Sequence, residues 1–117
     1  MKQTVVVKFG GSLSKNENAK SAFLNSIAAL SRKARAVLVH GGGPEINNWL
    51  NRLGIRSRFV GGLRVTDGPT LEIVEMVLSG KVNKALVAGL NKRGSSAAGI
   101  SGKNDHFIGT RYCMPQR

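Results

Sequence analysis

The sequence has 117 residues, is 41% hydrophobic and carries a formal net charge of +12 from 18 Lys and Arg against 6 Asp and Glu. This length suits one modest globular domain, and no apolar run reaches membrane-spanning length. The basic residues are scattered without a run of five like charges and aromatic residues make up only 5%, which favours small anionic ligands over nucleic acid. With no signal-peptide pattern and a single cysteine, Cys113, we expect a cytoplasmic protein.

Residues 5–9 predict a short strand buried on both faces, because three β-branched residues are followed by Lys8, Phe9 and a glycine pair. A lysine at the end of a buried strand is costly unless an anion meets it. Gly10 and Gly11 let the backbone turn sharply and present bare N–H groups. This segment therefore predicts a phosphate or carboxylate site, and the alternative is an edge-strand lysine that reaches water before an ordinary turn.

A helix is predicted to begin at Ser14, which stands at capping-box spacing from Glu17. A second short buried strand follows at residues 36–39, so the order strand, helix, strand predicts a βαβ unit with a parallel sheet. The apolar positions that give the helix its stripe are Ala19, Phe23, Ser26, Ile27, Leu30 and Ala34.

A second glycine turn, at residues 41–43, follows the second strand and leads into a helix with Pro44 in its first turn. That helix is predicted to end at Gly54. First-turn N–H groups and the helix dipole favour an anion at such a start, so two glycine turns after adjacent strands suit a reaction between two anions. Neither turn has dinucleotide-binding or Walker A spacing. His40 either acts as a general base beside the turn or is a hydrogen-bonded structural histidine.

Residues 55–67 predict a β-hairpin that turns at Gly61-Gly62 and carries Arg64. A guanidinium suits bidentate recognition of a carboxylate, and the alternative is a solvated hairpin arginine.

A further helix is predicted to open at Gly68-Pro69, to break or kink at Gly80, and to be followed by another helix that ends before Gly94. Residues 95–101 then predict a third core strand. Asn83 and Lys84 either contact the site or lie on a solvated face. The acidic residues form no cluster, so no metal site built from protein ligands is expected.

Five motifs in unbroken order over residues 4–105 resemble the acetylglutamate kinases of the amino acid kinase family. The motifs are Val-Lys-Phe-Gly-Gly-Ser (7–12), Val-His-Gly-Gly-Gly-Pro-Glu-Ile-Asn (39–47), Gly-Leu-Arg-Val-Thr-Asp (62–67), Glu-Met-Val-Leu-Ser-Gly-Lys-Val-Asn-Lys (75–84) and Gly-Ile-Ser-Gly-Lys (99–103). The glycine turns alone fit the wider family, and the Gly-Leu-Arg-Val-Thr-Asp hairpin narrows the resemblance to acetylglutamate kinases or to their aminoadipate relatives that act on a carrier protein.

The resemblance implies an α/β fold with an open, mainly parallel sheet sandwiched by helices, and with a hairpin over the substrate site. It implies phosphorylation of the side-chain carboxylate of N-acetyl-L-glutamate by ATP, with Mg²⁺ held through the nucleotide, in arginine biosynthesis. The implied roles are transition-state stabilisation by Lys8, phosphate binding by Gly10 and Gly11, and substrate binding by the residues Gly42, Gly43 and Arg64.

The resemblance also implies that the chain is truncated. Residues 1–105 resemble the N-terminal amino-acid-substrate domain, residues 106–117 match no family pattern, and the nucleotide-binding C-terminal domain is absent. We therefore expect the isolated chain to have little or no kinase activity, and the full-length protein to be a homo-oligomer. The alternative is a non-catalytic fragment that binds an acylated amino acid or a partner subunit. A basic nucleic-acid binder is the least favoured class.

Overall fold

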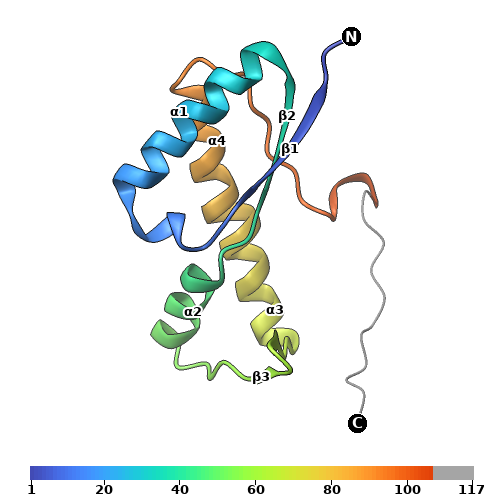
Figure 1. Ribbon diagram of the computed structural model, residues 1–117. Helices are drawn as coiled ribbons and strands as arrows, with labels where there is room; N and C mark the ends of the chain where they lie inside the picture. The colour runs from blue at the N-terminus through green and yellow to red at the C-terminus, as the bar shows by residue number, and fades with distance from the viewer. Residues whose placement is uncertain (107–117) are drawn as a thin grey trace.

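The computed structural model describes residues 1–106, so Cys113 and all but the first residue of the predicted tail at 106–117 lie outside the described residues. Figure 1 shows a pair of strands beside a set of helices, with a small hairpin at one end. No helix among the described residues is both long and apolar enough to cross a membrane. The elements in chain order are β1 (Thr4–Phe9), the 3-10 turn η1 (Leu13–Lys15), α1 (Glu17–Lys33), β2 (Arg35–His40), α2 (Gly43–Arg52), β3 (Phe59–Val60), β4 (Leu63–Arg64), α3 (Gly68–Glu75), the π-helical segment η2 (Met76–Val82), α4 (Asn83–Asn91) and the 3-10 turn η3 (Asn104–His106).

The parallel βαβ unit is confirmed. Strands β1 and β2 pair in parallel, in a register that runs from Thr4↔Arg35 to Phe9↔His40, and α1 connects them. Both strands therefore end at the same edge of the sheet, and a glycine turn follows each of them there.

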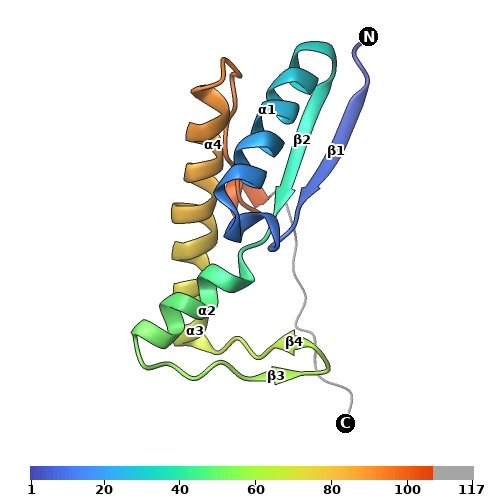
Figure 2. The same ribbon diagram turned by 60° about the vertical axis from the view of Figure 1, so that its left-hand side comes forward.

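The expectation that the first strand is buried on both faces is wrong. Its exposure alternates, with Val5, Val7 and Phe9 on the covered face and Val6 and Lys8 exposed. Figure 2 shows α1 and α4 on the same side of the two strands. The described residues thus form an open α/β fold in which helices cover one face of the parallel pair and leave the other face exposed, so the expected sandwich of helices on both faces is not formed among them.

Two small apolar clusters form the core. The first lies between the covered sheet face, α1 and α4, and the second lies between α2 and the helical segment from α3 into η2. Val82 packs against both clusters and joins them. The buried members are Phe9, Leu24, Ile27, Leu86 and Leu90 in the first, and Ile46, Leu50, Ile73 and Val77 in the second.

The first helix begins later than the sequence predicts. Asn16 is its N-cap and accepts a hydrogen bond from the Ala19 N–H at 3.0 Å, while the Ser14 hydroxyl donates instead to the Gly11 carbonyl at 2.6 Å. The buried stripe of α1 is centred on Leu24 and Ile27, and Ser26 is exposed.

Glycines end the helices and form the hairpin where the sequence predicts. At the end of α2, the Ile55 N–H donates to Leu50 at 2.9 Å and Gly54 has φ +69°, as in a Schellman motif. Gly94, with φ +82°, follows the end of α4. In the hairpin, Gly61 and Gly62 have φ +56° and +78°, the positive pair that a type I′ turn requires.

The helix that opens at Gly68 does not break at Gly80. Helix α3 passes through the π-helical segment η2 into α4 without an interruption. A π-segment accommodates the glycine by widening the turn, and this shifts the side-chain faces of α4 relative to those of α3.

The third strand predicted at residues 95–101 is not formed. Its exposure alternates as in a strand, but no neighbouring strand pairs with it among the described residues. Instead the Asn91 side chain bonds both the N–H and the C=O of Ala97, at 2.7 and 3.2 Å. The amino-acid composition of residues 95–101 predicts only an extended backbone. A β-strand also requires a neighbouring strand to which its backbone groups can hydrogen-bond.

Candidate functional site

The two glycine turns lie side by side at the carboxyl edge of the parallel strands. A Cβ added to Gly11 would come within 3.4 Å of the Pro44 Cδ atom, so the first turn packs against the first residues of α2. The register pairs Phe9 with His40, which places both turns immediately beyond the last strand pair. The predicted adjacency of the turns is therefore present.

Close packing explains why position 42 holds a glycine. Gly42 is the N-cap of α2, and a Cβ there would lie 2.7 Å from Leu78 Cδ2 and 3.3 Å from Val82 Cγ2. The turn is thus wedged against η2, and the N–H groups of the first turn of α2 remain available to an anion because an α-helix leaves its first four N–H groups without intrahelical partners.

Arg64 is held against α2. Its Nη2 donates to Asn47 Oδ1 at 2.6 Å, its Nη1 donates to Ser57 Oγ at 2.8 Å, and its guanidinium carbon lies 4.7 Å from the centre of the Phe59 ring. Asn47 is four residues after Gly43, so it lies on the same face of α2 about one turn further along. Because a guanidinium carries five N–H donors, three of them have no hydrogen-bond partner among the described residues. Arg64 is half-buried, and its role as a substrate ligand stays a prediction.

Lys8 lies at the end of β1, two residues before the first glycine turn, and its side chain is on the exposed face of the strand pair. No contact among the described residues joins Lys8 to Arg64. The structure therefore brings the four predicted glycines together at the start of α2, anchors Arg64 about one turn further along that helix, and places Lys8 at the adjoining strand end.

The charge next to the second turn is partly compensated. Glu45, in the first turn of α2, accepts a hydrogen bond from the Trp49 Nε1 at 3.2 Å and lies 3.3 Å from the Lys81 ammonium. This pairing directs the one carboxylate of the first turn toward η2.

At the other end of the hairpin, Asp67 caps α3. Hydrogen bonds from the Thr70 hydroxyl and the Thr70 N–H, followed by the positive charge of Arg58, lower the pKa of the Asp67 carboxyl below its usual value.

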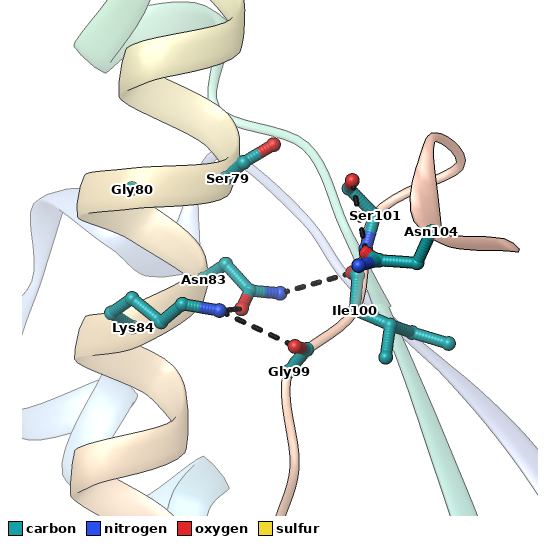
Figure 3. Close-up of a pocket in the computed structure, with 8 residues that line it drawn as sticks. All are labelled: Ser79, Gly80, Asn83, Lys84, Gly99, Ile100, Ser101 and Asn104. Carbon is teal, nitrogen blue, oxygen red and sulfur yellow. Dashed lines mark hydrogen bonds between the residues drawn. The ribbon is translucent and has the colours of Figure 1, made fainter.

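His40 is a hydrogen-bonded structural residue. Its Nε2 lies 3.1 Å from Asn83 Nδ2 and its Nδ1 lies 3.0 Å from the Gly41 carbonyl, and the tautomer with the proton on Nδ1 satisfies both contacts. Lys84 fixes the Asn83 amide by donating to its Oδ1 at 3.1 Å, and also donates to the Gly99 carbonyl at 3.3 Å. Figure 3 shows Asn83 and Lys84 reaching from the helix toward residues 99–101.

Asn83 is buried, so the alternative of a solvated face is wrong for this residue, whereas Lys84 is exposed. Through His40, Asn83 is connected to the carbonyl of Gly41, the first residue of the second glycine turn.

Two hollows lie beside this arrangement rather than within it. One has a volume of about 310 Å³ next to Lys84 and Ser101 (Figure 3), and the other, of about 890 Å³, lies between β2 and residues 95–103. The predicted site residues line neither hollow; these residues are Lys8, Gly10, Gly11, Gly42, Gly43 and Arg64.

Residues 3–109 match the family model described as the amino acid kinase family. The chain belongs to this family. It is 54% identical over 108 residues to the acetylglutamate kinase of Prochlorococcus marinus (strain AS9601), a match that covers 92% of this chain and 38% of that relative. It is also 54% identical to the acetylglutamate kinase of Endomicrobium trichonymphae, over 92% of this chain and 43% of that relative.

The solved structure of smu.665 from Streptococcus mutans UA159 superposes with a TM-score of 0.72 at 28% identity, covering 91% of this chain and 43% of that one. The amino acid kinase fold expected from the motifs is thereby confirmed. The chain spans less than half the length of the relatives named here.

Sequence reasoning missed Asn47 and Ser57, which orient Arg64, and it missed the contact of Asn83 with His40. The four-residue spacing between Gly43 and Asn47 is a signal that could have found the first. The other two contacts depend on the path of the hairpin and on the π-segment, for which the sequence carries no local signal.

Proposed function

We propose that this chain is the substrate-side part of an ATP-dependent kinase that phosphorylates the side-chain carboxylate of N-acetyl-L-glutamate. The observation that carries the proposal is the meeting of two glycine turns at the start of α2, with Arg64 anchored one turn along the same helix. The names of the relatives, which are 54% identical to this chain, support the choice of N-acetyl-L-glutamate.

On the substrate side, the proposal assigns the α-carboxylate to Arg64. Asn47 and Ser57 occupy two of its N–H donors and thereby fix the plane of the guanidinium. The backbone N–H groups of Gly42 and Gly43 would donate to the amino acid, where the positive end of the α2 dipole also favours a negative charge.

On the phosphate side, the proposal assigns Gly10 and Gly11 to the ATP phosphates and Lys8 to the phosphoryl group in transfer. A side-chain carboxylate oxygen forms a bond to the γ-phosphorus while the bond from that phosphorus to the bridging oxygen breaks, which gives an acyl phosphate and ADP. The carboxylate is already ionised, so the step needs no general base, in agreement with a His40 that is committed to Asn83 and Gly41.

The difficulty in this reaction is the repulsion between two anions, which positioned N–H groups and a lysine reduce. Within residues 1–106, no three His, Cys, Asp or Glu side chains gather as metal ligands. The proposal has Mg²⁺ held through the nucleotide, where it would neutralise phosphate charge.

A second candidate is binding without phosphoryl transfer, since the chain spans only 38% to 43% of the acetylglutamate kinases named above. We expect the 117-residue chain by itself to show little turnover. A carrier-protein-linked aminoadipate or glutamate substrate remains the alternative within the kinase class, and homo-oligomer formation remains a prediction.

Isothermal titration calorimetry of N-acetyl-L-glutamate into the chain tests the substrate side. Arg64→Ala and Arg64→Lys should both weaken binding roughly 10- to 100-fold, because a charge-assisted hydrogen bond contributes about 1.5–3 kcal/mol and each 1.4 kcal/mol is tenfold. Arg56→Ala, an exposed arginine of the same segment, is the matched control and should leave binding unchanged.

Equal binding by the Arg64 variants and the unchanged chain would refute the assignment of Arg64. A second titration in the presence of ATP·Mg separates the two candidates. Tighter binding of N-acetyl-L-glutamate with nucleotide supports the kinase, and binding that ignores nucleotide supports the second candidate.

A further inference from the structure

The peptide unit between Gly41 and Gly42 is held in place by a side chain rather than by packing. Gly41 lies between β2 and the N-cap of α2, is exposed, and would meet nothing within 4 Å if it carried a Cβ. Within residues 1–106 its carbonyl has one polar contact, with His40 Nδ1 at 3.0 Å. Among the described residues, the His40 ring therefore fixes the plane of this peptide.

The direction of the Gly41 carbonyl sets the direction of the Gly42 N–H. The two groups belong to one planar trans peptide unit, so they point in opposite directions. A rotation that turns the carbonyl away from His40 turns the N–H by the same angle. Within residues 1–106 the Gly42 N–H donates no hydrogen bond, and it is one of the donors that the proposed function assigns to the amino acid.

The neighbours of His40 favour one tautomer of its ring. An ammonium can only donate, so Lys84, which lies 3.1 Å from Asn83 Oδ1, determines which way the Asn83 amide points. The amide nitrogen, which also only donates, then faces His40 Nε2 at 3.1 Å. A neutral imidazole that accepts at Nε2 carries its proton on Nδ1, where the Gly41 carbonyl can accept it.

The Asn83 amide is itself fixed by close packing. Asn83 is only 8% exposed, and a Cβ added to Gly99 would overlap its Oδ1. Lys84 also donates to the Gly99 carbonyl at 3.3 Å, and Figure 3 shows the Lys84 ammonium between this carbonyl and Asn83. The exposed turn is thus connected, through His40, to an amide that is held on two sides.

We propose that Asn83 and His40 are positioning residues for the substrate. Asn83 holds His40 in the tautomer with the proton on Nδ1, His40 holds the Gly41 carbonyl, and the Gly42 N–H is thereby directed toward the amino acid. Neither side chain touches the substrate, and no proton is transferred. This role rests on the proposed function, because the direction of the N–H matters only if an amino acid binds at the start of α2.

Nuclear magnetic resonance tests the tautomer without any ligand. Long-range ¹H–¹⁵N correlation spectra of the ¹⁵N-labelled chain at alkaline pH, where imidazole rings are neutral, report which ring nitrogen carries the proton. The unchanged chain should show His40 protonated on Nδ1. Asn83→Leu should shift the ring toward protonation on Nε2 and should move the amide resonance of Gly42. His40→Asn identifies the His40 signals by their loss.

Calorimetric titration with N-acetyl-L-glutamate tests the substrate role. Asn83→Leu and His40→Leu should each weaken binding roughly 3- to 10-fold, because the Gly42 N–H is no longer held in one direction. The amide nitrogen of an asparagine occupies the position of a histidine Nδ1, so His40→Asn keeps a donor for the Gly41 carbonyl and should keep binding. Adding Asn83→Leu to His40→Asn should cause no further loss, since the donor no longer depends on a tautomer.

Asn91→Leu is the matched control. It is the same substitution in the same helix and removes two hydrogen bonds to Ala97, but it does not contact His40. Binding and the His40 tautomer should both be unchanged in this variant. The fluorescence of Trp49, which packs against the second core cluster, reports whether each variant is folded.

The possible failures can be told apart. If the unchanged chain binds N-acetyl-L-glutamate and both leucine variants of His40 and Asn83 bind it equally well, the positioning role is overturned while the proposed function stands. A ring protonated on Nε2 in the unchanged chain, or an equal effect of Asn83→Leu in the His40→Asn background, also overturns the role. Absence of binding by the unchanged chain refutes the proposed function and the substrate role with it, whichever tautomer is found.

Discussion

Gly89→Ala should destabilise the chain when Leu24 is present, and the same substitution should stabilise the chain when Leu24 is replaced by alanine. Gly89 lies in the last turn of α4, and a Cβ added there would stand 2.8 Å from Leu24 Cδ1 of α1. Carbon atoms prefer separations of about 3.5–4.0 Å, so the new methyl group would overlap Leu24 by roughly 1 Å. Leu24 is only 3% exposed and is enclosed by Phe9, Ile27 and Leu86, which restricts its escape.

Two opposing terms set the magnitude. Alanine is about 0.8–1.0 kcal/mol more favourable than glycine inside a helix. Overpacking a core costs about 1–3 kcal/mol. Gly89→Ala should therefore destabilise the chain by about 1 kcal/mol. In a Leu24→Ala background the overlap is gone, and the same substitution should stabilise the chain by about 0.5–1 kcal/mol.

Urea unfolding followed by helical circular dichroism measures both values in a double-mutant cycle. Ala85→Gly, at an exposed position of the same helix, is the control that isolates helix propensity and should cost about 1 kcal/mol. The coupling between positions 24 and 89 should be about 1–3 kcal/mol. If Gly89→Ala has the same effect in both backgrounds to within about 0.5 kcal/mol, the packing argument is refuted.

Three further predictions concern stability. Leu50→Ala should cost about 2–5 kcal/mol in urea unfolding because Leu50 is 0% exposed, whereas Leu53→Ala, at a side chain 52% exposed, should change stability by less than about 0.5 kcal/mol; equal losses would contradict the packing of the second cluster. Asn16→Ala should lower the free energy of unfolding by about 1 kcal/mol through loss of the α1 cap, and a thermal melt identical to that of the unchanged chain would argue against the cap. The pKa of Asp67 is lowered in the folded chain, so its contribution to stability is present above about pH 3.8 and is lost as the pH falls through the folded pKa. Asp67→Asn should therefore reduce the dependence of the urea unfolding midpoint on pH in that range. An unchanged pH dependence in this variant would contradict the Thr70 hydrogen bonds.

The sequence predicted the features that depend on neighbouring residues. The parallel βαβ unit, the hairpin turn at Gly61-Gly62 and the helix ends at Gly54 and Gly94 are local, because apolar periodicity and positive-φ glycines act within a few residues. The predicted start of the first helix at Ser14 is wrong because two residues able to cap a helix stand close together. Asn16, not Ser14, accepts the hydrogen bond from the first turn of α1.

In the candidate site, too, the local features were predicted from the sequence and the long-range contacts were not. The spacing of strand, glycine turn and helix predicted that the two turns lie together, and this was confirmed by the approach of Gly11 to Pro44. The contacts of Arg64 with Asn47 and Ser57 could not be predicted, because they join segments whose relative position is fixed only after the hairpin packs on α2.

Local preferences of the chain thus account for which segments are helical or extended and for where the backbone turns. Long-range packing accounts for the burial of Asn83 against His40, for the open face of the sheet, and for the absence of a strand partner for residues 95–101 among the described residues. Burial and strand pairing are properties of two surfaces in contact, and a single segment specifies only one of them.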